Sequence, residues 1–441
     1  QLLHPHQSGF RKKHSCHTAL VRLTDTWLAA INHSQLTGAV FLDLKKAFDM
    51  VDHNVLLSKL QLYISDSSPH ASTSAPTASN SPPSPTVQSC LNSPTVQSCS
   101  NKRDALSFFR SYLSGREQYT VVNGTKSSRG VITRGVPQGT VLGPLLFCLF
   151  INDLPLSLSN HEISCDLFAD DATIHTPDKN ISVVNQRLQQ GLNDVTEWCQ
   201  NNRMILNAAK TECMVITTRQ KHQLSPLTLN LSVQNEPINQ VTEHRLLGVT
   251  VDSQLKWQAH INRLCKTLSK NVFLLSKLRH LVHSDACKLF YNAHIKSHID
   301  YGSTLWDGSS EVHLKSVNSL YRRAAKLILN DPSLTTDQKL QKLDILPFTK
   351  HLAFNKAVVM FKIRSGALPH YLCELFSQSI SRYPTSRQNL NVPRPRIDIF
   401  KTSLSFSGPT LWNHLPTSIK NAGSLFSYKE RLFNYLMAVS S

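Results

Sequence analysis

The chain has 441 residues, 40% of them apolar and 17% charged, which is enough for several globular domains. Its net charge of +18 at pH 7 indicates a polyanionic partner, and the excess is concentrated from Lys256 onward, where 26 Lys and Arg stand against 10 Asp and Glu. None of the ten cysteines has CxxC spacing, which argues against a zinc ribbon and suits reduced thiols in an intracellular protein. The longest apolar stretch, 141–151, is too short to span a bilayer, so we expect no membrane partner.

Apolar periodicity predicts a mixture of helices and strands over the first 252 residues. The predicted helices are 14–31, 51–62, 106–113, 141–154 and 183–201. The predicted strands are 38–43, 119–122, 130–134, 163–168, 172–176, 211–217 and 246–251, with a turn at Asn123-Gly124 between the second and third.

A segment of different composition interrupts this pattern between residues 65 and 101. It is rich in Ser, Pro and Thr and contains a nine-residue tandem duplication, SPTVQSCLN at 84–92 and SPTVQSCSN at 93–101. Such a segment has too few large apolar residues to build a core, so we expect a disordered insertion within one domain.

The chain beyond Trp257 is predicted to be mainly helical. The expected helices are 258–282, 285–298, 312–329, 350–365 and 424–438, and the Pro-rich stretch 384–416 is expected to be irregular.

Three carboxylates are predicted to stand at strand ends. Asp170 and Asp171 lie between the apolar strands 163–168 and 172–176, and Asp43 ends the strand 38–43. Neighbouring carboxylates repel each other, and bound divalent cations offset that repulsion, as two-metal phosphoryl transfer requires. The alternative is that Asp170 and Asp171 form an ordinary solvated turn.

Six segments, in a fixed order, surround these carboxylates and carry the chain's most specific pattern. They are QSGFRKKHS at 7–15, FLDLKKAFD at 41–49, RGVPQGTVLGP at 134–144, FADD at 168–171, LNAAKT at 206–211 and LLGVTVD at 246–252. Taken together they resemble the reverse transcriptases of non-LTR retrotransposons, the LINE-type elements, with most similarity to the CR1, L2 and Rex-like groups. The resemblance covers nearly the whole chain except the Ser/Pro-rich insertion.

The resemblance implies an α+β fold of the right-hand polymerase type, in which an antiparallel sheet flanked by helices forms the palm and a mainly helical thumb and C-terminal region follow. The implied divisions are a partial fingers region at 1–37, a palm and fingers domain at 38–64 and 102–252, the insertion at 65–101, a thumb at 253–330 and a basic C-terminal region at 331–441.

The resemblance also implies the catalytic roles. Asp43 and Asp170 would bind two Mg²⁺ ions, for which Mn²⁺ is a possible substitute, and Asp171 would be a looser ligand or would orient the other two. Leu44 would offer a backbone carbonyl to one metal. Lys210 would be the general acid for the leaving pyrophosphate, with a solvated surface lysine as the alternative.

Residues that resemble the family's nucleotide-binding positions lie in the second and third segments and at the N-terminus. Phe48 would be a steric gate that favours deoxynucleotides, with core packing as the alternative. The remaining implied contacts to the incoming nucleotide are Arg11, Lys12, Pro137, Gln138 and Gly139. For Arg11 and Lys12, the start of a basic helix is the alternative.

The primer and template are implied to lie on the last segment and the basic helix after it. Leu247 and Gly248 would contact the primer end, and Lys266, Lys270 and Lys277 would follow the duplex backbone. The implied partners are an RNA template, a DNA primer or target and deoxynucleoside triphosphates. The implied location is nuclear, with a cytoplasmic ribonucleoprotein stage.

Two other functions compete with an RNA-directed DNA polymerase. A catalytically inactive or co-opted remnant that only binds RNA or DNA would also be basic, but it has no need to keep Asp43, Asp170 and Asp171. An RNA-copying RNA polymerase is disfavoured by Phe48 and by the Phe-Ala-Asp-Asp sequence. Because the chain begins at Gln1 without Met, inside what resembles an established motif of the family, we expect a fragment of a longer polypeptide that lacks the family's endonuclease.

Overall fold

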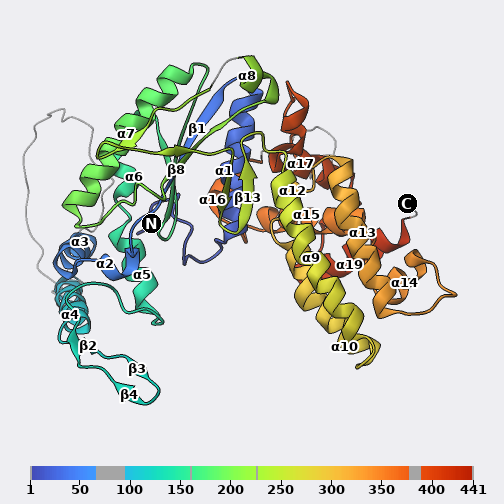
Figure 1. Cartoon of the computed structure of the whole chain (residues 1–441), viewed down its shortest axis with the longest axis horizontal. Coiled ribbons are helices and arrows are strands. Elements are labelled where there is room, and N and C mark those ends of the chain that lie inside the picture. The colour runs from blue at the N-terminus through green and yellow to red at the C-terminus, as the bar shows by residue number, and fades with distance from the viewer. Residues whose placement is uncertain (1, 66–94, 159–160, 225–226, 377–388, 440–441) are drawn as a thin grey trace, which may run out of the picture. The chain divides into compact units, whose positions relative to one another are not determined.

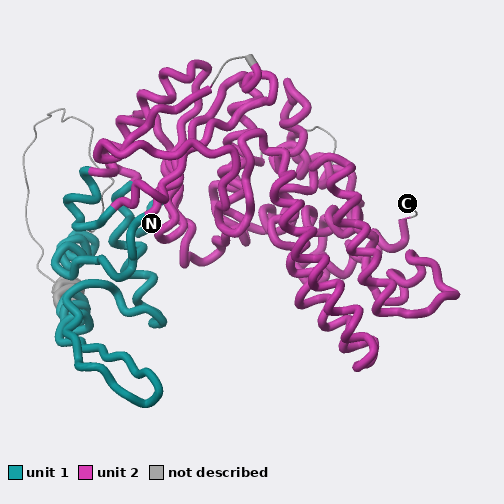
Figure 2. Tube along the Cα trace, in the orientation of Figure 1, with its two compact units in different colours: residues 1–4, 44–154, 197–205 teal, residues 5–43, 155–196, 206–441 magenta. Residues whose placement is uncertain are grey.

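The structure is a computed structural model that describes residues 2–65, 95–158, 161–224, 227–376 and 389–439. The chain divides into two compact units (Figure 2). Unit 1 consists of residues 1–4, 44–154 and 197–205, and unit 2 consists of residues 5–43, 155–196 and 206–441. No helix among the described residues is both long enough and apolar enough to cross a membrane.

A five-stranded sheet with the order β11-β8-β1-β7-β6 lies at the centre of unit 2 (Figure 1). The strands are β1 (Leu36–Leu42), β6 (Ser164–Phe168), β7 (Asp171–Asp178), β8 (Glu212–Ile216) and β11 (Asn239–Gln240). β1 pairs antiparallel with both β7 and β8, whereas β11 runs parallel to β8. Every residue of β1 is buried, as expected for a central strand covered on both faces.

Helices α1 (Cys16–Asn32) and α7 (Ile181–Asn201) cover opposite faces of this sheet. At Gly38 a Cβ atom would lie 2.4 Å from the Val184 side chain of α7, so the close packing there requires glycine. The Trp27 ring of α1 meets the His175 ring edge-on at a centroid distance of 6.0 Å. His175 pairs with Ala39, the neighbour of Gly38, so its side chain points to the other face.

The rest of unit 2 is mainly helical after the hairpin of β12 (Glu243–Leu246) and β13 (Val249–Asp252). The longer helices are α9 (Gln258–Leu278), α10 (Ser284–Tyr291), α13 (Glu311–Ile328), α14 (Thr336–Lys342), α15 (Phe348–Arg364), α17 (Leu404–His414) and α19 (Leu425–Ala438). Before this hairpin lie α8 (Arg219–Leu224) and the short hairpin of β9 (Ser232–Val233) and β10 (Glu236–Pro237). The shorter elements after it are a π-helical turn at Asn292–Lys296, α11 (Ser297–Asp300), α12 (Ser303–Trp306), α16 (His370–Glu374), a 3₁₀ turn at Asp398–Thr402 and α18 (Thr417–Lys420). One hydrophobic cluster runs from α1 and the sheet to α19, so parts of the predicted palm, thumb and C-terminal region share a core.

Unit 1 contains a small group of helices and two short β-ladders. The helices are α2 (Ala47–Met50), α3 (His53–Ser65), α4 (Thr95–Leu113) and α5 (Leu142–Phe150), and α6 (Leu154–Ser157) follows at its border. The ladders pair β2 (Glu117–Gln118) with β5 (Gly130–Val131) and β3 (Val121–Val122) with β4 (Thr125–Lys126). The Lys59 ammonium joins α3 to the end of α5, because it donates to the Phe150 carbonyl and to Asp153 at 2.7 Å each.

Most predicted elements are confirmed within two or three residues, including the hairpin that carries the aspartate pair. Among the long helices of unit 2, α9 ends at Leu278, four residues before its predicted end, and the predicted helix 285–298 is divided between α10, the π-helical turn and α11. Residues 66–94 of the predicted insertion lie outside the described residues, and α4 begins at Thr95, inside the range predicted to be disordered. The Asn123-Gly124 turn is confirmed, but it joins β3 to β4, and 130–131 pairs with β2 instead.

Two predictions of secondary structure are wrong. Residues 246–251 form a hairpin turn and not one strand, because Leu247 and Gly248 both have positive φ, at 45° and 83°. The stretch 384–416 is not irregular throughout, because it contains α17, with Pro409 inside the helix. The Asp25 carboxylate accepts the first two backbone N–H groups of this helix, from Leu404 at 2.9 Å and from Ser405 at 2.7 Å.

Candidate active site

Adjacent strands of the unit 2 sheet bring the three predicted carboxylates to the same edge. Leu42 of β1 pairs with Ala172 of β7, so one further step of the same register places Asp43 beside Asp171. Asp170 lies in the two-residue turn between β6 and β7, just before Asp171, the first residue of β7. Asp171 pairs with Phe168, the last residue of β6, across this turn. Directly opposed residues point to the same face of a sheet. The predicted convergence of segments more than 120 residues apart therefore follows from the strand pairing.

The β6–β7 turn is held in place by the segment just before α1. Ala169, at the tip of the turn, has a φ of 57°, a left-handed conformation that is unusual for a residue with a side chain. The fully buried Gln7 accepts hydrogen bonds through Oε1 from the backbone nitrogens of Ala169, at 3.1 Å, and Gly9, at 2.7 Å. A Cβ atom on Gly9 would lie 2.3 Å from the Ala169 nitrogen. This close contact explains why glycine follows Gln7-Ser8 and gives the first sequence segment a structural role.

Asp43 is tied to the loop that carries Lys210. The Asn207 side chain donates to Asp43 Oδ2 at 2.8 Å, and the Asn207 backbone nitrogen donates to the Asp43 carbonyl at 2.8 Å. The Asp43 nitrogen in turn donates to the Thr211 hydroxyl at 3.3 Å. Lys210 lies between these anchored residues with an exposed side chain. The fifth segment is thus placed beside the carboxylates.

The electrostatics of the turn reflect several negative charges in a small space. Burial raises the pKa of Asp170 above its ordinary value, and the nearby charge of Asp43 raises it further. Burial likewise raises the pKa of Asp171, and the charges of Asp170 and Asp43 add to this effect, while the charge of His244 opposes it. The charge of Asp43 therefore makes ionisation of both Asp170 and Asp171 less favourable, as expected for a cluster that is stabilised by a bound cation.

His244 is a neighbour of this cluster that the sequence did not indicate. Its ring stacks on the Phe41 ring at a centroid distance of 3.8 Å, and its Nδ1 lies 2.6 Å from Glu212 Oε2. Phe41 and Glu212 are themselves paired residues of β1 and β8. A lone histidine in a predicted loop gives no signal of this arrangement, because it depends on the strand register.

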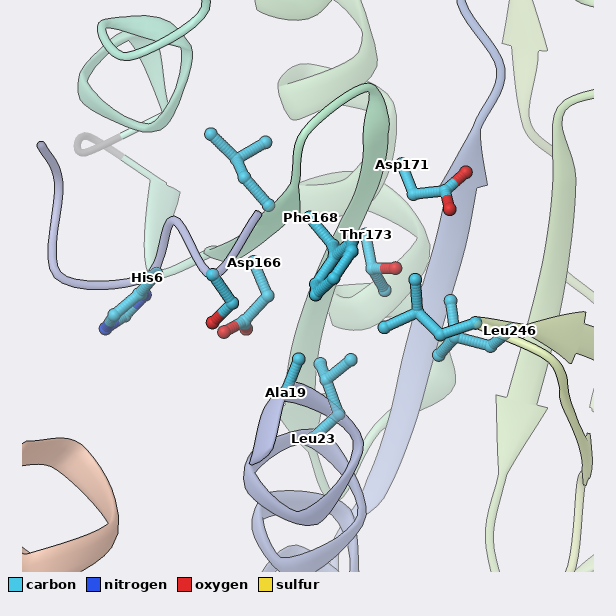
Figure 3. Close-up of a pocket in the computed structure, with 11 residues that line it drawn as sticks. His6, Ala19, Leu23, Asp166, Phe168, Asp171, Thr173 and Leu246 are labelled. Carbon is cyan, nitrogen blue, oxygen red and sulfur yellow. The ribbon is translucent and has the colours of Figure 1, made fainter. Parts of the chain in front are cut away.

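A pocket adjoins the β6–β7 hairpin on the side of α1. Figure 3 shows His6 and Asp166 on one side of this pocket and Asp171 and Leu246 on the other. The buried Asp166 accepts from Arg22 Nε at 2.6 Å and lies 3.0 Å from His175 Nε2. Burial alone would raise the pKa of Asp166, but its hydrogen bond to His175 and the charge of Arg22 hold that pKa below its ordinary value. Asp166 is therefore a paired structural carboxylate, unlike Asp170 and Asp171.

The donor set suits a hard divalent cation, because clustered carboxylate oxygens are the ligands that Mg²⁺ prefers. Within the described ranges, however, no group of three or more His, Cys, Asp or Glu side chains is arranged to hold a metal ion. One reason is visible at Asp43, whose Oδ2 already accepts from Asn207. The backbone thus gathers the ligands, and a metal would require the side chains to turn toward it.

Several predicted nucleotide-binding residues lie in unit 1, together with Leu44. The half-buried Phe48 stacks on the Phe147 ring at a centroid distance of 4.3 Å. Gln138 is exposed and donates to Asp49 Oδ1 at 2.9 Å. Gly139 has a φ of 75°, which favours glycine in the loop that begins at Pro137. These contacts order the loop before α5 around the Phe48 segment.

The predicted phosphate-binding residues at the N-terminus lie in unit 2. The Arg11 guanidinium donates to the Gln7 carbonyl at 3.1 Å, so it is part of the same segment that supports the catalytic turn. Lys12 is exposed. The adjacent Lys13 donates to the Gly366 carbonyl at 2.6 Å.

The predicted primer and template residues lie on the β12–β13 turn and on α9. The Tyr301 hydroxyl donates to the Leu247 carbonyl at 2.5 Å and fixes the turn, and a Cβ on Gly248 would lie 3.3 Å from the Tyr301 ring. Five of the exposed residues of α9 form a stripe at helical spacing: Arg263, Lys266, Lys270, Phe273 and Lys277. The stripe combines positive charge with an aromatic ring, since Lys277 Nζ lies 5.5 Å from the Phe273 ring centre.

The fold and the site define a mixed helix-and-sheet protein whose acidic residues gather where two adjacent strands meet. A sequence model of the family described as "Reverse transcriptase (RNA-dependent DNA polymerase)" matches residues 1–251. The chain belongs to the reverse transcriptase family.

Its curated relatives come from transposable elements. The chain is 25% identical over 342 residues to a probable RNA-directed DNA polymerase from transposon BS of Drosophila melanogaster, an alignment that covers 75% of this chain and 33% of the relative. It is 25% identical over 358 residues to the RNA-directed DNA polymerase from mobile element jockey of the same species, covering 76% of this chain and 34% of the relative. The chain thus spans about a third of the length of these relatives. The expected resemblance to LINE-type reverse transcriptases is confirmed.

Among solved structures, the telomerase from Candida albicans in complex with a fragment of telomeric RNA aligns with a TM-score of 0.39 and 14% identity, over 78% of this chain and 52% of that one. The apo telomerase from Candida tropicalis aligns with a TM-score of 0.37 and 10% identity, over 79% and 52%. At these scores the likeness carries no argument about this chain.

Proposed function

We propose that this chain is the polymerase part of a non-LTR retrotransposon protein and adds deoxynucleotides to a primer 3′-hydroxyl on an RNA template. The observation that carries the proposal is the register of β1 and β7, which brings Asp43 beside Asp171 and the β6–β7 turn. Membership of the reverse transcriptase family supports the same activity. The right-hand arrangement of palm, fingers and thumb is part of this proposal.

The carboxylates are the groups that would hold two Mg²⁺ ions. When bound, these ions supply a lowered pKa for the primer hydroxyl and charge neutralisation at the triphosphate. Asp43 and Asp170 would be the shared ligands, Asp171 would bind more loosely or orient the other two, and the Leu44 carbonyl would add a further oxygen. Asn207 holds Asp43 in place, because its side-chain amide donates to Asp43 Oδ2.

Other residues of the chain position the substrate and the proton. Arg11 and Lys12 bind triphosphate oxygens, and Lys210 donates a proton to the leaving pyrophosphate. Phe48 excludes the ribose 2′-hydroxyl from the nucleotide site. The loop of Pro137, Gln138 and Gly139 contacts the base pair being formed.

The primer and template follow the helical part of unit 2. The turn at Leu247 and Gly248 supports the primer end, and the α9 stripe with Lys266, Lys270 and Lys277 lies along the sugar–phosphate backbone. In the element's life cycle, the target DNA supplies the primer. The protein first binds the RNA in a cytoplasmic ribonucleoprotein and then acts in the nucleus.

Primer extension tests this function against both alternatives. The purified full chain is incubated with a DNA primer annealed to RNA, with Mg²⁺, and with either deoxynucleotides or ribonucleotides. We expect addition of deoxynucleotides alone, and the Asp170→Asn variant should fall below detection while binding primer–template as the parent does. Binding without extension by the parent would identify a remnant, and ribonucleotide addition would identify an RNA polymerase.

A further inference from the structure

A projecting ribbon in unit 1 has no role in the function proposed above. We call residues 116–134 the ribbon arm; it consists of the β2–β5 and β3–β4 ladders and ends at the Asn123-Gly124 turn (Figure 1). Both turn residues have positive φ, at 50° and 82°, as a tight hairpin requires. Every residue from 117 to 131 is exposed, so the apolar side chains of the ribbon arm do not serve a core.

The two faces of the ribbon arm differ in chemistry. Side chains alternate along each strand, and the pairs Glu117↔Val131 and Val121↔Lys126 assign residues across the strands to one face. Contacts agree with this assignment: Lys126 Nζ lies 5.4 Å from the Tyr119 ring centre, and an Arg129 nitrogen lies 3.4 Å from Glu117. We call this the tyrosine face; its members are Glu117, Tyr119, Val121, Lys126, Arg129 and Val131. Between residues 117 and 131 the opposite face carries uncharged residues, among them Gln118, Thr120, Val122 and Thr125, whereas Arg116 and Arg134 lie at the base of the arm.

A bulge lies opposite Tyr119. Gln118 pairs with Gly130, whereas Thr120 pairs with Ser127, whose nitrogen donates to the Thr120 carbonyl at 2.9 Å. One residue therefore lies between the pairs on the first strand and two on the second, which is the definition of a β-bulge. Bulges change the direction of a side chain, and this one includes Arg129. It places Arg129 on the same face of the ribbon arm as Tyr119 and Lys126.

We propose that the tyrosine face binds single-stranded RNA, with a base stacked on Tyr119 and flanking phosphates on Lys126 and Arg129. An exposed aromatic ring on a face that also carries cations is the combination that binds single strands without sequence preference, because every base has a stacking surface. The bases of a duplex are already stacked on each other and cannot reach such a ring. The choice of RNA over DNA rests on the proposed function, which provides an RNA template.

The charges of the ribbon arm favour a polyanion. Arg116, Lys126, Arg129 and Arg134 stand against Glu117, a balance of four positive charges to one negative. The ion pair of Arg129 with Glu117 is exposed on both sides and is worth little in water. A phosphate can therefore replace Glu117 as the partner of Arg129 at small cost.

The test measures binding of a labelled single-stranded RNA to the full chain, without primer or nucleotides, at several salt concentrations. Tyr119→Ala should weaken binding about tenfold and leave the salt dependence unchanged, because stacking is not ionic. Lys126→Gln and Arg129→Gln should each reduce the slope of log K against log salt by about 0.7, the value for one phosphate contact to a single strand. Val122→Ala, on the opposite face of the same hairpin, is the matched control and should bind as the parent does.

The outcomes separate this proposal from the polymerase function. Asp170→Asn should bind single-stranded RNA as the parent does. If the parent shows no polymerase activity but Tyr119→Ala still weakens RNA binding, only the polymerase assignment is contradicted. Parent-like RNA binding by Tyr119→Ala, or equal losses in Tyr119→Ala and Val122→Ala, would overturn the proposal. Binding of single-stranded DNA is measured in the same way. If Tyr119→Ala weakens the binding of DNA and not of RNA, the assignment to RNA is contradicted. A duplex that competes as well as the single strand would contradict stacking as its basis.

Discussion

Replacing Gln7 should slow polymerisation strongly while the protein stays folded. In Gln7→Leu the backbone nitrogens of Gly9 and Ala169 lose their shared acceptor. Each buried N–H group left without a partner costs about 1–3 kcal/mol. The substitution also removes Gln7 Nε2, which is buried and has no hydrogen-bond partner among the described residues, and this regains about 1–3 kcal/mol. The net loss in the free energy of unfolding is therefore about 1–3 kcal/mol.

The rate of polymerisation should also fall, because the released nitrogen belongs to the turn that carries Asp170. A displacement of about 1 Å in a reacting group can cost about 100-fold in rate. We expect single-turnover primer extension per folded molecule to fall about 100-fold. Two backbone hydrogen bonds that do not involve the Gln7 side chain, from Ser8 to Leu167 and from Leu167 to His6, keep the segment attached.

Gln189→Leu is the matched control for this experiment. Gln189 also accepts a backbone N–H, from Ser232 at 2.9 Å, and donates to the Ser232 carbonyl at 3.0 Å. It should therefore lose a similar amount of stability, measured by urea denaturation, and keep the parent's extension rate. If Gln7→Leu also extends at the parent's rate once corrected for the folded fraction, the turn does not depend on Gln7 and the reasoning is refuted.

Three further predictions concern stability, pH and the primer turn. Gly9→Ala should destabilise the protein by about 2–3 kcal/mol, because the added Cβ would lie 2.3 Å from the backbone nitrogen at the tip of the β6–β7 turn. Gly423 has open space around it, so Gly423→Ala is the control and should be within about 0.5 kcal/mol of the parent. Thermal denaturation measures both. Burial raises the pKa of the Asp25 carboxyl to about 6, above its ordinary value of 3.8. The free energy of unfolding of the parent should therefore fall by about 2 kcal/mol relative to that of Asp25→Asn as the pH rises from 4 to 7, because the carboxyl ionises less readily in the folded protein than in the unfolded chain. A constant difference between the two proteins in urea denaturation across that range would contradict this. Tyr301→Phe removes the hydrogen bond to the β12–β13 turn, which should lower the free energy of unfolding by about 0.5–1.5 kcal/mol. The variant should also bind primer–template more weakly in a titration. Unchanged affinity would show that the turn is held by other contacts.

The sequence predicted the parts of the site that depend on local pattern. Alternating apolar residues on both sides of Asp170 and Asp171 predicted the hairpin, and the Asn123-Gly124 pair predicted a tight turn, both of which the structure confirms. Family order of the segments then indicated which distant strand end, that of Asp43, belongs to the same site. The pairing of β1 with β7 supports that choice.

The sequence could not predict features that depend on register or on tertiary contacts. Gln7 supports the catalytic turn and His244 lies beside Asp171, but neither residue type signals this by itself. The hairpin at Leu247 was missed because a leucine rarely adopts positive φ, and here Tyr301 from a distant helical segment holds the turn. Helix α17 was missed because Pro409 argues against a helix, while its N-terminus is capped by Asp25, 379 residues earlier in the chain.

The claim on which the account depends is that Asp43, Asp170 and Asp171 form one cation site. It is tested most directly by titrating the full chain with Mn²⁺ and following free Mn²⁺ by electron paramagnetic resonance. The proteins compared are the parent, Asp43→Asn, Asp170→Asn and, as the control, Asp331→Asn, a half-buried aspartate elsewhere in unit 2. We predict that the first two variants lose the tightest Mn²⁺ binding and that Asp331→Asn retains it. Equal Mn²⁺ affinity and stoichiometry in all four proteins would contradict the shared site and, with it, the proposed polymerase mechanism.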